Sequence, residues 1–83
     1  MSALPYDLAE ALQQYQTSQK IALRLAESDP SNAHWQQDLS ISHNKVGDIL
    51  RAQGDLAGAL QQYQESRRIR QRLAESDLSN AEW

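Results

Sequence analysis

Apolar residues recur at helical spacing in three segments of the chain. From residue 8 onward, apolar and small side chains recur every three or four residues, at Leu8, Ala11, Leu12, Tyr15, Ser18, Ala22 and Leu25. The same spacing follows at Trp35, Leu39, Ser42, Val46, Ile49 and Leu50, and again at Leu56, Ala59, Leu60, Tyr63, Ser66 and Leu73. Such steps place residues on one stripe of an α-helix. We therefore expect an all-α fold with three helices, near residues 6–28, 32–53 and 55–76.

The first and third segments are copies of each other. Residues 7–35 align with residues 55–83, and 21 of the 29 aligned residues are identical. A repeat of this length is typical of helical arrays, in which each unit buries its apolar face against a neighbour. The chain thus holds one whole period and most of a second, and we expect a single domain over residues 1–83.

Three residues predict where the helices end and begin. Pro30 disfavours a helical conformation in the residue before it and suits the first turn of a new helix. Gly54 can adopt the left-handed conformation that ends a helix, and Asp55 can then cap the next helix. This short connection predicts that the second and third helices form an antiparallel hairpin.

The stretch from Val46 to Tyr63 resembles the tetratricopeptide repeat (TPR) family. The matching residues are Val46, Gly47, Leu50, Gly54, Asp55, Leu56, Ala59, Leu60 and Tyr63. In the family, a small residue at the position of Gly47 lets the paired helix cross closely. The period of 48 residues is longer than the usual one of about 34 and is similar to longer-period bacterial variants.

The resemblance implies a fragment of a helical repeat array with the helix order B–A–B. The helix near 32–53 would be an A helix, and the two copies would be B helices. The family implies a protein-binding or scaffolding module that has no catalytic activity and no cofactor. Because A helices line a concave peptide groove in such arrays, the implied ligand-binding residues are Ile41, Asn44, Lys45, Asp48 and Arg51. An ordinary solvated helix face is the alternative interpretation of this stripe.

Two other interpretations of the function remain open. In B–A–B order, one apolar flank of the first helix has no covalent neighbour, and Trp83 repeats Trp35 as if a further A helix began there. Other copies of the chain could cover this flank and the Trp83 end, as a homo-oligomer or by exchange of helices.

The basic segment Arg67–Arg72 leads to the other hypothesis, which is contact with nucleic acid. Its arginines point in several directions around a helix and no aromatic residue is interleaved, which favours an exposed helix with salt bridges.

Composition narrows the classes of function further. The net charge of −3 gives no overall positive field that would attract nucleic acid. No apolar run approaches the roughly 20 residues of a membrane span, and the first residues do not resemble a secretory signal. The absence of cysteine suits a reducing compartment, so we expect a cytoplasmic protein.

The sequence shows no arrangement of residues that predicts chemistry. His34 and His43 are too far apart for the one-face pair of a helical zinc site, and we expect both at the surface or at an edge. No nucleophile, base and orienting residue occur in a recognisable context. We therefore expect no enzyme and no metal or cofactor.

Overall fold

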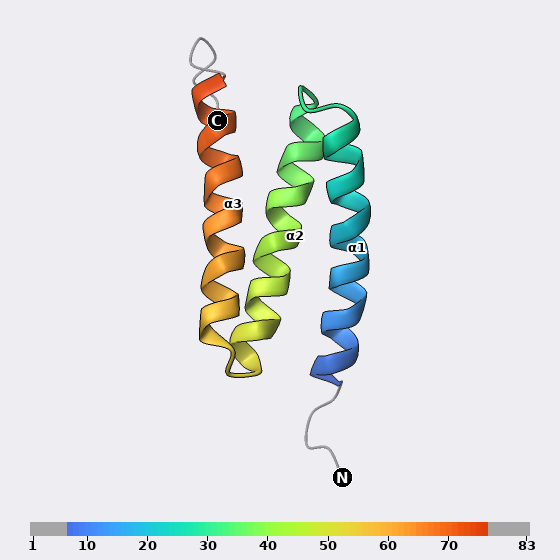
Figure 1. Cartoon of the computed structure of the whole chain (residues 1–83), viewed down its shortest axis with the longest axis vertical. Helices are drawn as coiled ribbons and strands as arrows, with labels where there is room; N and C mark the ends of the chain where they lie inside the picture. Colours follow the sequence, from blue (N-terminus) through green and yellow to red (C-terminus); the bar gives the residue numbers. More distant parts are fainter. Residues whose placement is uncertain (1–6, 77–83) are drawn as a thin grey trace.

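The computed structural model describes residues 7–76, which form three antiparallel helices (Figure 1). They are α1 (Leu8–Ser28), α2 (Ala33–Ala52) and α3 (Leu56–Ser76). These bounds agree with the expected helices to within two residues, so the prediction of an all-α fold is confirmed. The expectation of a further helix beginning at Trp83 lies outside the described residues.

The helix ends follow local capping rules. Asp7, Asn32 and Asp55 each accept a hydrogen bond from a backbone N–H in the first turn of the helix that follows, at 2.9, 3.1 and 2.9 Å respectively. Gly54 has a φ of +89°, the left-handed conformation expected after the end of α2. Pro30, in contrast, lies in the connection between α1 and α2 and not in the first turn of α2, because Asn32 caps that helix.

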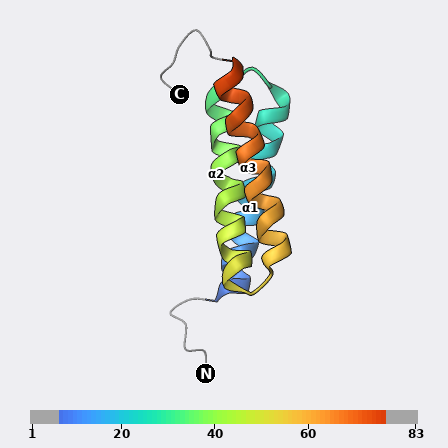
Figure 2. The same ribbon diagram turned by 90° about the vertical axis from the view of Figure 1, so that its left-hand side faces the viewer.

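The central helix α2 packs against both other helices. It contacts α1 on one side and α3 on the other, whereas the backbones of α1 and α3 do not approach each other. The view turned by 90° places α3 in front of α1, with α2 beside them (Figure 2). Two surfaces of α2 therefore remain outside the helix contacts. One forms the floor of a groove between α1 and α3, and the other faces away from that groove.

The core is small and combines side chains from all three helices. One cluster joins Ala26 of α1, Leu39 of α2, and Ile69 and Leu73 of α3, and Val46 and Ala59 are buried as well. Beside it, the buried hydroxyls of Ser40 and Ser66 lie 3.1 Å apart and form a hydrogen bond between α2 and α3. This bond satisfies two polar groups that would otherwise be costly to bury.

Gly47 lies in a tight contact between α2 and α3. It is buried, and a Cβ atom added there would lie 2.9 Å from Cε1 of Tyr63. Such a distance is shorter than van der Waals contact, so any larger side chain must displace the Tyr63 ring. Gly47 therefore leaves room for the Tyr63 ring, which confirms the expectation that packing requires a glycine at this position.

Candidate interaction surfaces

The five residues expected to bind a ligand do lie together on one surface of α2. Ile41, Lys45, Asp48 and Arg51 are exposed, and Asn44 is half-buried. Ile41 and His43 are two residues apart and therefore project about 200° apart around the helix. His43 faces the groove between α1 and α3, so Ile41 faces the opposite way. We call the surface formed by these five residues the outer face of α2.

Two surface hollows border the outer face, and Ile41 contributes to both. The hollow toward α3, called the α3-side hollow, also includes Asn44, Arg70 and Leu73. The hollow toward α1, called the α1-side hollow, also includes Lys45, Tyr15, Ser18 and Ala22. The side chain of Ile41 is 44 % exposed, so an aliphatic group is accessible between two concave regions.

Two residues of the outer face also make contacts within the protein. Asp48 accepts a hydrogen bond from the hydroxyl of Tyr63. This bond raises the pKa of Tyr63 above its ordinary value of 10.0, because loss of the phenol proton would break the bond and bring two negative charges together. The Nζ of Lys45 lies 5.9 Å from the centroid of the Tyr15 ring, within the range of a cation–π interaction. Asp48 and Lys45 therefore hold neighbouring helices in place as well as forming part of the outer face.

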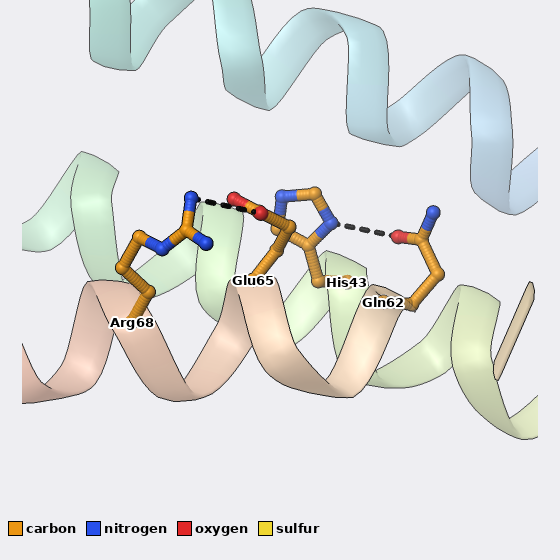
Figure 3. A network of polar contacts seen from close by, with 4 residues as sticks. All are labelled: His43, Gln62, Glu65 and Arg68. Atoms are coloured by element: carbon orange, nitrogen blue, oxygen red, sulfur yellow. Dashed lines mark hydrogen bonds and ion pairs between the residues drawn. The ribbon is translucent and has the colours of Figure 1, made fainter. Parts of the chain in front are cut away.

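A polar cluster joins the three helices in the groove on the opposite side of α2. Nδ1 of His43 lies 2.8 Å from Nε2 of Gln19 and 2.7 Å from Oε1 of Gln62, and these two amide atoms are 2.9 Å apart. Figure 3 shows His43 and Gln62 in this groove. Nε2 of Gln19 is a donor and Oε1 of Gln62 is an acceptor, whereas Nδ1 of His43 is a donor in one tautomer and an acceptor in the other. In either tautomer two of the three atoms are both donors or both acceptors and cannot bond to each other. At most two of the three contacts are therefore hydrogen bonds at once.

His43 was expected at the surface or at an edge, and it is half-buried where it lines the groove between α1 and α3. Its contacts with Gln19 and Gln62 were not predicted from the sequence. The available signal was its spacing from Val46, three residues later and buried, which places both on neighbouring parts of the helix surface. His34, in contrast, is exposed as expected.

The arginines of the basic segment do not gather on one surface. Arg68 forms an ion pair with Glu65 at 3.1 Å, visible beside the groove in Figure 3. Arg72 also borders the groove, whereas Arg70 lines the α3-side hollow on the other side of α2. The expected spread of these side chains around the helix is therefore confirmed, and residues 67–72 do not form a continuous positive strip.

The described residues offer no grouping for metal chemistry or for a membrane span. Within residues 7–76, no three histidine or carboxylate side chains lie close enough together to hold a metal ion. None of α1, α2 and α3 is both long and apolar enough to cross a membrane. Comparison of the chain with family models, with curated proteins and with solved structures found no match.

Proposed function

We propose that this chain is a protein-binding module of the TPR kind, without catalytic activity, and that its outer face of α2 contacts the partner. The observation that carries the proposal is Ile41, an exposed aliphatic side chain that lies between two hollows and beside the four polar residues of the outer face. An apolar anchor within a polar rim is the usual composition of a protein contact site. The duplicated helices and the tight contact between Gly47 and Tyr63 support the proposed repeat architecture.

The α3-side hollow suggests the chemistry of the ligand. Ile41 and Leu73 supply an apolar surface, the Asn44 amide can both donate and accept hydrogen bonds, and Arg70 supplies a positive charge. A guanidinium group binds carboxylates through charge-assisted hydrogen bonds. The ligand that fits is a peptide segment with an apolar side chain next to an acidic group.

A peptide screen against the immobilised chain tests this proposal. Selected peptides should carry an apolar residue beside an acidic one, and Ile41→Ala should weaken their binding by about tenfold or more, as for loss of a central apolar anchor. Leu60→Ala is the matched control, because Leu60 is an exposed leucine of α3 that lies outside both hollows. Arg70→Gln should weaken binding most at low salt, since screening already reduces the contribution of Arg70 at high salt.

Two results would remove the outer face from consideration. One is that the screen selects no peptide. The other is that alanine variants of the remaining face residues all bind selected peptides as the parent does; these residues are Asn44, Lys45, Asp48 and Arg51.

Self-assembly is a second candidate function. It is favoured by the exposure of Ile21 and Leu25 on α1, which leaves two large aliphatic side chains on one flank without cover from the described residues. If copies of the chain associate through this flank, the thermal unfolding midpoint should rise with protein concentration. A monomer by sedimentation throughout the micromolar range would exclude this candidate. For either function we propose a cytoplasmic location, on cysteine content alone.

A further inference from the structure

The two copied helices carry the same residues on a face that only α3 buries. Ile69 and Leu73 of α3 are 8 % and 9 % exposed. Their copies in α1, Ile21 and Leu25, are 57 % and 40 % exposed. The residue types are identical, so the difference comes from the neighbouring helix and not from the sequence of the face.

The same difference is found at other positions of this face. Ala59 and Ser66 of α3 are buried, whereas their copies Ala11 and Ser18 are half-buried and exposed. Together with Tyr15, the copy of Tyr63, these residues have the three- and four-residue spacing of one helix face. We call this surface the open face of α1; its residues are Ala11, Tyr15, Ser18, Ile21 and Leu25.

The contact between α2 and α3 shows what kind of helix fits these residues. Tyr63 covers Gly47, where there is no room for a Cβ atom, and Ser66 forms its hydrogen bond with Ser40. Ser40 and Gly47 are seven residues apart, two helical turns along one face of α2. Because Tyr15 and Ser18 are the copies of Tyr63 and Ser66, a helix with small residues at this spacing would fit against the open face of α1.

The open face also continues into a concave region. Tyr15 and Ser18 line the α1-side hollow together with Ile41 of α2. A helix seated on the open face would lie beside α2 as well as on α1, and would cover Ile41 in addition to Ile21 and Leu25. The open face of α1 is thus bordered, at Tyr15 and Ser18, by a hollow between α1 and α2.

We propose that the open face of α1 binds a helix of the α2 pattern that another polypeptide supplies. The bound helix places a glycine against Tyr15 and a serine, or another small residue, against Ser18. A second copy that keeps its own α2–α3 contact cannot supply this helix, because its Gly47 and Ser40 are already covered by its α3. The proposal goes beyond peptide binding in the α3-side hollow and does not depend on it.

A peptide with the sequence of residues 31–54, which spans α2 and its caps, is the first probe. Its binding to the full chain can be followed by fluorescence anisotropy of a label on the peptide. Ile21→Glu in the chain should weaken binding by more than about tenfold, because a carboxylate would be buried against the peptide without a partner. Leu23→Glu is the matched control. Leu23 is exposed on the same helix but borders the groove on the other side, so this variant should bind normally.

The sequence of the probe supplies a second control. A Gly47→Leu peptide should not bind, because its leucine would clash with the Tyr15 ring as a side chain at position 47 clashes with the Tyr63 ring in the α2–α3 contact. Arg70→Gln in the chain should leave binding of the parent peptide unchanged. The same variant weakens binding of ligands to the α3-side hollow, so failure of one proposal can be told apart from failure of the other.

A fusion tests the same contact without relying on the affinity of a free peptide. Residues 31–54 are joined directly to Asp7 in place of residues 1–6, which reproduces the connection from Gly54 to Asp55 because Asp7 is the copy of Asp55. A second fusion carries Gly47→Leu in the added segment. The thermal unfolding midpoint of the parent fusion should be higher than that of the second fusion by more than about 4 °C. Ile21→Glu in the fusion should abolish this difference.

Three results would overturn the proposal. The first is equal peptide binding by the Ile21→Glu and Leu23→Glu variants, or none by the parent chain. The second is equal midpoints for the two fusions. The third is a dimer of the chain alone that Ile21→Glu dissociates, which would show that a second copy occupies the open face.

Discussion

Substitution of Gly47 measures how closely α2 and α3 pack. In a helix interior alanine is favoured over glycine by about 1 kcal/mol, so Gly47→Ala would stabilise an unpaired helix. In the folded chain the new Cβ atom lies 2.9 Å from Cε1 and 3.2 Å from Cζ of Tyr63. Overpacking of this kind costs about 1–3 kcal/mol. Because the ring is also held by its hydrogen bond to Asp48, we expect the clash to exceed the helix propensity and Gly47→Ala to destabilise the protein by about 1 kcal/mol.

The assay is a double-mutant cycle with Tyr63→Ala, followed by thermal and urea unfolding at one fixed protein concentration. For a domain of this size, 1 kcal/mol corresponds to a shift of about 4–8 °C in Tm. In the Tyr63→Ala background the space beside Gly47 is empty, so Gly47→Ala should now stabilise by about 1 kcal/mol. The expected coupling energy between the two positions is therefore about 2 kcal/mol.

Two outcomes would refute this reasoning. If Gly47→Ala raised Tm in the parent background, the ring would be moving aside at little cost and the crossing would not require glycine. If the substitution had the same effect in both backgrounds, Tyr63 would not be the group that restricts this position. In either case glycine at position 47 would need a different explanation.

Three further predictions concern single contacts. Ser66→Ala leaves the buried Ser40 hydroxyl without its partner and should cost about 1–3 kcal/mol in urea unfolding, whereas adding Ser40→Ala should cost less than the sum of the single changes. In a spectrophotometric titration Tyr63 should ionise above its ordinary pKa of 10.0, and Asp48→Asn should lower that pKa. The bond's contribution to stability is full below pH 10.0 and is lost as the pH rises through the raised value. Gly54→Ala should destabilise by about 1–2 kcal/mol because φ is positive there, and Gly54→Asn, which tolerates this conformation better, should cost less.

The helices themselves could be predicted from local patterns. The three- and four-residue spacing gave all three helices, and Gly54 and Asp55 gave the hairpin connection. These features are local, since a cap or a positive φ depends on residues within one turn. The need for glycine at position 47 was also visible, because glycine is unfavourable in a helix interior unless packing requires it.

The candidate surfaces were only partly predictable. The spacing of Ile41 and its four polar neighbours showed that they share one face of α2, but not that Ile41 lies between two hollows. The contact of Asp48 with Tyr63 and the position of His43 between α1 and α3 depend on residues far away in the sequence. No local pattern specifies such contacts, because they arise only when the helices pack.

The duplication separates what the sequence determines from what only the tertiary structure decides. The sequence by itself determined that α1 and α3 are helices with the same apolar residues, since 21 of 29 aligned positions are identical. It did not determine which part of the apolar stripe is buried. Ile69 is buried and Ile21 is exposed, whereas Leu56 is exposed and its copy Leu8 is half-buried. The physical reason is the order of the helices, because α2 follows α1 but precedes α3 and so covers a different flank of each.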